Sequence, residues 1–181
     1  MGQVHGRSPN DVERLELALA AGSVVRRQGP CQAASKDKQT PYVAHPFRVA
    51  LTVRHVFGVE DTTALVAALL HDTIEDTTTD YDDLAAEFGR DVADTVVALT
   101  KDSRLPEPER EAAYDQQLTA ASWQARLVKL ADVFDNFCDA LDDQKRSKVA
   151  EKARRAIAYA GDDPRLRVGV AAVSRLLEGR S

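Results

Sequence analysis

The chain has 181 residues, a length typical of one domain or slightly more, which excludes a multi-module enzyme. Apolar residues make up 44% of it and charged residues 29%, the composition of a globular protein rather than of a disordered or membrane-spanning one. Asp and Glu outnumber Lys and Arg by 29 to 24, giving a formal charge of −5. Coating of nucleic acid is therefore excluded as the main task, and an anionic ligand would have to be held locally, by a metal ion or a few cations.

The sequence carries no sign of export or membrane insertion. The N-terminal segment MGQVHGRSPND lacks the pattern of a signal peptide, and no apolar run reaches the roughly 18 residues that a membrane span needs. Cys31 and Cys138 form no CxxC pair, so neither a disulfide framework nor a thiolate zinc site is indicated, and Cys138 is interpreted as a buried apolar filler. We expect a cytoplasmic protein without a membrane partner.

Apolar residues recur at steps of three and four along the chain, with few alternating β-branched runs. This pattern predicts an all-α helical bundle of roughly eight to ten helices. Residues 1–8 are expected to form a disordered tail, and residues 9–181 one domain with no internal repeat.

In chain order, a first helix is expected to follow the capping segment Ser8-Pro9-Asn10-Asp11. Residues 28–41 have no usable periodicity and are expected to form a long loop, which in many proteins is a functional segment. His45-Pro46 opens the next helix, because proline suits the first helical turn, and Gly58 closes it. Further helices are expected over residues 61–75, 81–88 (closed by Gly89), 91–100, 110–121, 123–141, 149–159 and 166–177.

The most informative stretch is the segment 69–77, LLHDTIEDT. On a helix His71 and Asp72 lie about 100° apart, and Glu75 and Asp76 follow within about a turn and a half, so all four can border one face. The preceding residues are strongly apolar, so this polar group emerges from the end of a buried element. Neighbouring carboxylates repel one another, and a divalent cation is the simplest way to neutralise them.

A simpler interpretation is an amphipathic helix that ends in a solvated acidic turn with one incidental histidine, and other residues bear on the choice. His45 stands at a helix start, where a lone histidine is more often a cap or a packed ring than a ligand. Asp132 lies within an apolar helical run and needs a partner for its charge, and Asn136 aligns with it at i+4. Together His45, His71, Asp72 and Asp132 would supply two imidazoles and two carboxylates from three helices, a donor set that suits Mn²⁺, Fe²⁺ or Zn²⁺.

These segments resemble the HD-domain phosphohydrolases of the RelA/SpoT type, and in particular the stand-alone small alarmone hydrolases that remove the 3′-pyrophosphate of (p)ppGpp. The likeness covers roughly residues 12–160. It rests on the segments 40–46 (TPYVAHP), 71–77 (HDTIEDT), 88–89 (FG), 99–102 (LTKD) and 129–132 (KLAD) together with Asn136. It implies an all-helical bundle with a single Mn²⁺ held by His45, His71, Asp72 and Asp132.

The resemblance also implies roles for further residues. Glu75 and Asp76 match the pair that orients and activates the attacking water, a task for which carboxylates next to a metal are suited. Asn136 matches a residue that contacts the nucleotide, and Arg110 falls near a phosphate-binding position, although it could equally be a surface arginine. Relatives carry an arginine that stacks on guanine in the loop before Tyr42, whereas this chain has lysines there, of which Lys36 is the candidate phosphate contact.

The leading hypothesis is a (p)ppGpp 3′-pyrophosphohydrolase that acts on a small-molecule nucleotide and needs one divalent metal ion. Because the loop before Tyr42 differs, an HD-type phosphatase for another phosphorylated nucleotide or cofactor is the alternative. A binding module without turnover is a third possibility, against which the presence of Glu75 and Asp76 argues. The apolar face of residues 168–177 could pack internally or against a second copy of the chain.

Overall fold

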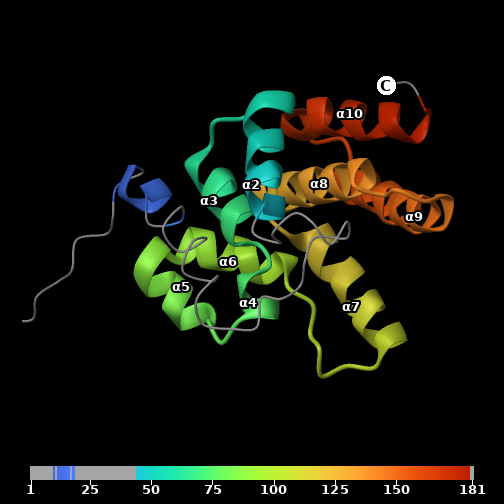
Figure 1. Ribbon diagram of the computed structural model, residues 1–181. Coiled ribbons are helices and arrows are strands. Elements are labelled where there is room, and N and C mark those ends of the chain that lie inside the picture. The colour runs from blue at the N-terminus through green and yellow to red at the C-terminus, as the bar shows by residue number, and fades with distance from the viewer. Residues whose placement is uncertain (1–9, 11, 17, 19–43, 180–181) are drawn as a thin grey trace, which may run out of the picture.

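The computed structural model describes residues 10, 12–16, 18 and 44–179, and all regular secondary structure in this part of the chain is helical, without a β-strand (Figure 1). Residues 12–16 and 18 are helical. The predicted all-α bundle of about eight to ten helices is therefore confirmed. The α-helices are α2 (Ala44–Leu51), α3 (Thr62–Leu70), α4 (Thr73–Asp76), α5 (Tyr81–Phe88), α6 (Arg90–Leu99), α7 (Glu107–Ala120), α8 (Trp123–Cys138), α9 (Asp143–Ala160) and α10 (Arg167–Leu177).

Two short helical segments of other geometry complete the order. A π-helical turn, Thr52–Val56, continues α2, and a 3₁₀ turn, Pro164–Leu166, precedes α10. None of the described helices combines the length and the apolar character that crossing a bilayer requires.

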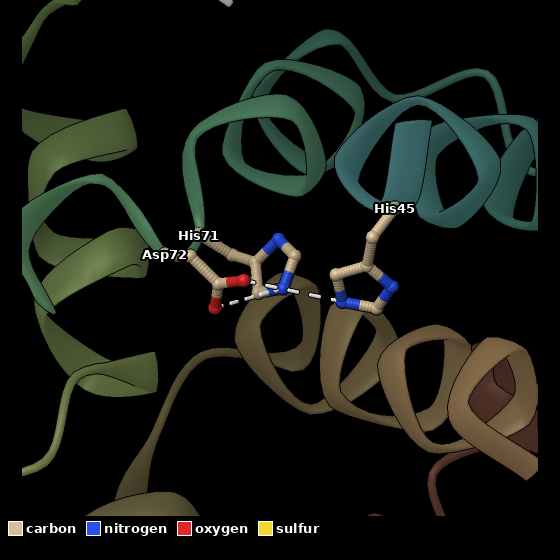
Figure 2. Close-up of side chains that lie close together, drawn as sticks. All are labelled: His45, His71 and Asp72. Atoms are coloured by element: carbon tan, nitrogen blue, oxygen red, sulfur yellow. Dashed lines mark ion pairs between the residues drawn. The ribbon is translucent and has the colours of Figure 1, made fainter. Parts of the chain in front are cut away.

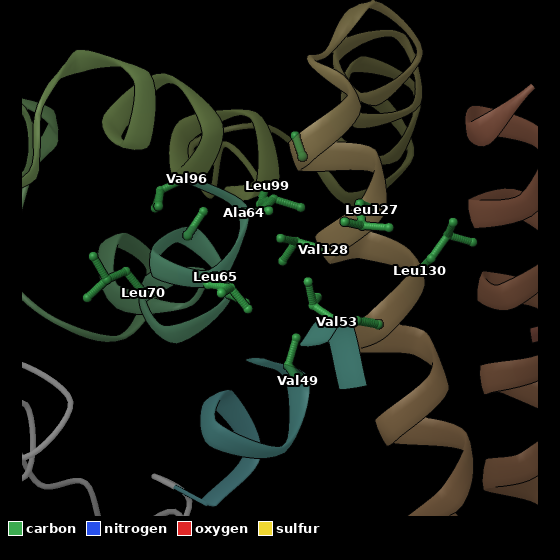
Figure 3. Packing of buried hydrophobic residues seen from close by; sticks show 14 of the residues in the cluster. Val49, Val53, Ala64, Leu65, Leu70, Val96, Leu99, Leu127, Val128 and Leu130 are labelled. Carbon is green, nitrogen blue, oxygen red and sulfur yellow. The ribbon is translucent and has the colours of Figure 1, made fainter. Parts of the chain in front are cut away.

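The centre of the fold is α3, which is apolar on all sides and buried from Ala64 to Leu70. A helix without a polar face must be surrounded by other elements, and α2, α6 and α8 all pack against it. Their side chains form one apolar core (Figure 3). Its members shown there include Val49, Val53, Leu65, Leu70, Val96, Leu99, Leu127, Val128 and Leu130.

α3 ends earlier than expected, and this changes how the polar group after it is presented. The expected helix over residues 61–75 stops at Leu70, and His71 and Asp72 form a turn before the short helix α4. The carbonyl of Ala68, which the Asp72 N–H would bind in a continuous helix, lies 2.9 Å from Nδ1 of His71. The single helical face predicted for His71, Asp72, Glu75 and Asp76 is thus replaced by a turn and a new helix start.

Other boundaries differ by a few residues. α9 begins at Asp143 rather than at residue 149. Its first turns are exposed and lack an apolar pattern, but Asp142 caps the helix by accepting from the backbone N–H of Lys145 at 2.8 Å. α7 begins at Glu107, with Pro108 in its first turn, where the missing N–H costs nothing. α8 ends at Cys138, which is exposed, so its interpretation as a buried filler was wrong. Cys31 lies outside the described residues.

Candidate metal centre

Three of the four predicted ligands come together at one point of the bundle. His45 stands in the first turn of α2, and His71 and Asp72 follow the C-terminal end of α3, so the packing of α2 against α3 brings them together (Figure 2). One ligand atom from each of the three lies within 4.8 Å of the others. Nε2 of His71 is 3.1 Å from Oδ1 of Asp72, and Nε2 of His45 is 4.0 Å from its Oδ2.

The fourth predicted ligand, Asp132, reaches the group from the middle of α8. Its Oδ1 lies 3.3 Å from Nε2 of His45. α8 packs against both α2 and α3, which explains how residues from three separate helical segments meet. The apolar run around Asp132 is what holds this carboxylate at the core, since Leu130, Ala131 and Val133 are buried.

The hydrogen bond of His71 fixes which of its ring nitrogens can bind a ligand. A carbonyl oxygen can only accept, so Nδ1 donates to Ala68 O, and in the neutral ring Nε2 carries the lone pair. That Nε2 is buried and has no hydrogen-bond partner among the described residues. A buried polar atom without a partner is costly, and a metal ion would satisfy it.

Charge around His45 also favours a cation here. Burial alone would lower the pKa of His45, but hydrogen bonds with Asp132 and Asp135 outweigh it and raise the pKa to about 9. Its ring centroid is 5.2 Å from that of His71. The carboxylates around His45 therefore attract positive charge, which in the absence of a metal ion is a proton on the ring. With both imidazoles neutral, as metal ligands must be, the two carboxylates give the set a charge of −2, which suits a divalent ion that accepts nitrogen and oxygen ligands.

A lysine that the sequence analysis did not assign to the site supports Asp132. Lys129, one turn earlier in α8, places Nζ 2.8 Å from Oδ2 of Asp132. Burial alone would raise the pKa of Asp132, but the charge of Lys129 and the hydrogen bond with His45 hold it well below its ordinary value. Asp132 is therefore ionised, with one oxygen held by Lys129 and the other facing His45.

Asp135 and Arg48 were also missed. Asp135 is buried in α8, and its Oδ2 lies 2.7 Å from Nδ1 of His45. Arg48 binds both oxygens of the same carboxylate, at 2.7 and 2.9 Å. The signals were present in the sequence, since Asp135 is a second acidic residue in the apolar run of α8 and Arg48 follows His45 by three positions.

The predicted water-activating pair lies directly after the turn that holds Asp72. Glu75 and Asp76 form the end of α4, and both are exposed. Oε1 of Glu75 accepts a hydrogen bond from the backbone N–H of Lys101 at 2.7 Å, which ties α4 to the segment after α6. An accessible, oriented carboxylate of this kind can accept a proton from water.

The predicted nucleotide contacts fall in different places. Asn136 aligns with Asp132 as expected and donates from Nδ2 to its backbone carbonyl at 2.9 Å and to its Oδ1. Arg110 lies half-buried in the first turn of α7, and within the described part of the chain its side chain makes no hydrogen bond or ion pair with the four ligand residues. Lys36 lies outside the described residues.

Two lysines next to the centre contact one buried aromatic ring, an arrangement that was not predicted. Nζ of Lys101 and Nζ of Lys129 lie 5.0 and 5.4 Å from the ring centroid of Tyr114, a buried residue of α7. The Tyr114 hydroxyl donates to Leu99 O at 3.0 Å, which fixes the ring. Each ammonium group is also ion-paired, Lys101 with Glu111 and Lys129 with Asp132, so two lysines and their carboxylates surround this ring beside the segment that contacts Glu75.

A model of the HD domain matches residues 24–162, more than three quarters of the chain. The chain belongs to the HD-domain family. The matched range contains all four ligand residues and the pair Glu75 and Asp76.

Individual proteins similar to this chain include named hydrolases and one solved structure. The chain is 39% identical over 123 residues to guanosine-3′,5′-bis(diphosphate) 3′-pyrophosphohydrolase MESH1 of Xenopus tropicalis, covering 68% of this chain and 69% of that protein. It is 41% identical over 128 residues to human MESH1, with 70% of each covered. A solved structure of a metazoan ortholog of SpoT, described as hydrolysing ppGpp, superimposes with a TM-score of 0.74 at 27% identity, over 97% of this chain and 100% of that one.

Proposed function

We propose that this HD-domain protein is a metal-dependent hydrolase that removes the 3′-pyrophosphate of (p)ppGpp and leaves GDP or GTP. The observation that carries the proposal is the meeting of His45, His71 and Asp72 within 4.8 Å, with Asp132 beside them, in a chain about 40% identical to named 3′-pyrophosphohydrolases. The substrate is a small nucleotide, as in those relatives.

Each ligand residue contributes a defined donor. His45 and His71 offer Nε2, and Asp72 and Asp132 each offer a carboxylate oxygen, to one divalent ion, which we propose to be Mn²⁺. When bound, the ion supplies Lewis acidity at the phosphoryl group and lowers the pKa of a coordinated water. The buried Nε2 of His71 supports this assignment, because it makes no hydrogen bond among the described residues and lies 3.1 Å from Oδ1 of Asp72, another proposed ligand atom.

The carboxylates of α4 would act in proton transfer from the attacking water. Hydrolysis joins a water oxygen to the phosphorus bound to the 3′-oxygen and breaks the bond between that phosphorus and the 3′-oxygen. Glu75 would accept the proton of the attacking water, and the leaving 3′-oxygen would become a hydroxyl by taking up that proton from Glu75, directly or through solvent. The backbone N–H of Lys101 orients Glu75 for this task, and Asp76 lies beside it in α4. We propose that Asn136, Lys36 and Arg110 contact the nucleotide.

Pyrophosphate release from ppGpp by the purified chain with Mn²⁺ tests the proposal. We expect GDP and pyrophosphate in equal amounts, lost on addition of EDTA and in an Asp72→Ala variant. Other nucleotides that carry a 2′- or 3′-phosphate are assayed in parallel. Turnover of one of these without turnover of ppGpp would overturn the substrate while keeping the chemistry, and no turnover of any by metal-loaded protein would overturn the enzyme.

A further inference from the structure

Asp135 occupies an unusual place for an acidic residue. It lies in α8 one turn after Asp132, and its side chain is 7% exposed. It contacts His45 on the side of the ring opposite the proposed ligands Asp72 and Asp132. Its Oδ2 is 2.7 Å from Nδ1 of His45, the ring nitrogen that faces away from Asp132. Burial of a carboxylate at this depth needs partners, and His45 is one of two.

Arg48 is the second partner and fixes the plane of the carboxylate. Nε of Arg48 donates to Oδ1 of Asp135 at 2.7 Å, and Nη2 donates to Oδ2 at 2.9 Å. The same Nη2 donates to Oδ2 of Asp139 at 2.6 Å. A guanidinium has only donors, so both oxygens of Asp135 accept, and the hydrogen of the contact with His45 resides on Nδ1.

We propose that Asp135 is a positioning residue that holds His45 in the tautomer whose Nε2 lone pair faces Asp72 and Asp132, with Arg48 fixing the carboxylate that does so. The inference rests on the metal centre of the proposed function. Ring orientation and basicity of a ligating histidine depend on the partner of its other nitrogen, so the arrangement raises metal affinity without Asp135 touching the ion.

Asp139 provides a matched control. It meets the same Nη2 of Arg48 and stands one turn after Asp135, but its contacts with the site run through Arg48 and not through His45. Replacing either aspartate by asparagine removes one negative charge from the same ion-pair cluster. Only the Asp135→Asn change alters the partner of the histidine ring.

The experiment measures the Kd for Mn²⁺ by titrating free Mn²⁺ in EPR spectra of the wild-type chain and the two variants. We expect the Asp135→Asn variant to raise the Kd about 10- to 100-fold and the Asp139→Asn variant to change it less than about threefold. Equal values in wild type and Asp135→Asn, or equal losses in both variants, would overturn the inference. Either of these outcomes would leave the proposed metal centre standing, because the wild-type chain still binds Mn²⁺. A wild-type chain that binds no Mn²⁺ would overturn both the metal centre and the inference.

A second measurement needs no variant and so stands even where Asp135→Asn fails to fold. Ring nitrogen and proton resonances of His45 are recorded by NMR in the wild-type chain loaded with diamagnetic Zn²⁺. The inference requires a proton on Nδ1, held in a hydrogen bond and slow to exchange, and none on Nε2. A His45 ring protonated on Nε2, or without a proton on Nδ1, would overturn it.

Discussion

Lys129 Nζ and Asp132 Oδ2 lie 2.8 Å apart, one turn from each other in α8, with side chains only 16% and 13% exposed. Burial alone would lower the pKa of Lys129, but the charge of Asp132 raises it above its ordinary value. The pair places a permanent cation behind the carboxylate that faces His45. It therefore neutralises the Oδ2 side of Asp132, while Oδ1, which also accepts from Asn136, faces His45.

Replacing Lys129 by methionine keeps the length of the side chain and removes its charge. Asp132 then remains buried without its lysine, and we expect the free energy of unfolding to fall by about 3 kcal/mol, the typical loss when one partner of a buried ion pair is removed. Chemical denaturation of the metal-free chain measures the change.

Lys145 and Asp142 supply the control, because they also form an ion pair three residues apart, at 3.1 Å, but with side chains 51% and 50% exposed. The Lys145→Met change is expected to cost less than about 1 kcal/mol. Similar losses in the two variants would show that burial of Lys129 and Asp132 has no special energetic role.

The sequence was sufficient for the parts of the site that depend on local pattern. His71 and Asp72 follow an uninterrupted apolar run, and that run is the buried helix α3. Asp132 stands out as an acidic residue in another such run. Gly89 closes α5 as predicted, in a conformation with φ of 93° that favours glycine.

The rest depended on how separate helices approach each other. Arg48 and Asp135 are 87 residues apart, and their contact is set by the crossing of α2 and α8, which periodicity does not encode. The turn at His71 is accompanied by a hydrogen bond from its ring to the carbonyl of Ala68, in a segment whose composition suits a continuous helix. The sequence predicts the start of α9 six residues too late, because its first turns are stabilised by the Asp142 cap rather than by an apolar face.

Metal binding should be visible in stability. A ligand present at 100 times its Kd stabilises the folded chain by about 2.7 kcal/mol, so saturating Mn²⁺ should raise the Tm by roughly 5 to 10 °C. Asp72→Asn removes a proposed ligand, and we expect that shift to disappear. Differential scanning calorimetry with Mn²⁺ and with EDTA measures it.

Asp76 is the matched control for Asp72, because it is an exposed aspartate four residues further along the chain. Asp76→Asn removes the same charge from the same segment without removing a proposed ligand, so its Tm should still rise with Mn²⁺. An unchanged shift in Asp72→Asn would remove Asp72 from the metal centre.

Glu75→Gln separates catalysis from binding. Glutamine keeps an oxygen that can accept from the Lys101 N–H, so the tie between α4 and the segment after α6 should survive, while the group that accepts a proton from water is lost. We expect kcat for ppGpp hydrolysis to fall about 10²- to 10⁴-fold, with the Kd for Mn²⁺ unchanged. Steady-state kinetics and the EPR titration give the two values, and wild-type kcat in the variant would exclude Glu75 as the base.

Gly169 reports on how closely α10 packs against the helices that carry the site. A Cβ added there would lie 3.2 Å from two ring carbons of Phe57 and 3.3 Å from Cδ1 of Leu130. Gly169→Val puts still more atoms into this contact, and overpacking of this kind costs about 1 to 3 kcal/mol in the free energy of unfolding, of which the higher helix propensity of valine returns only about 0.4 kcal/mol. Ala171→Val is the control, because residue 171 is exposed on the same helix and should lose only about 0.6 kcal/mol through helix propensity. Denaturant titrations give the free energy of unfolding of both variants.

If the Gly169 variant proved as stable as the Ala171 variant, α10 could move away from Phe57 without cost. The close packing of α10 on the π-helical turn and α8 would then not be a constraint on the fold.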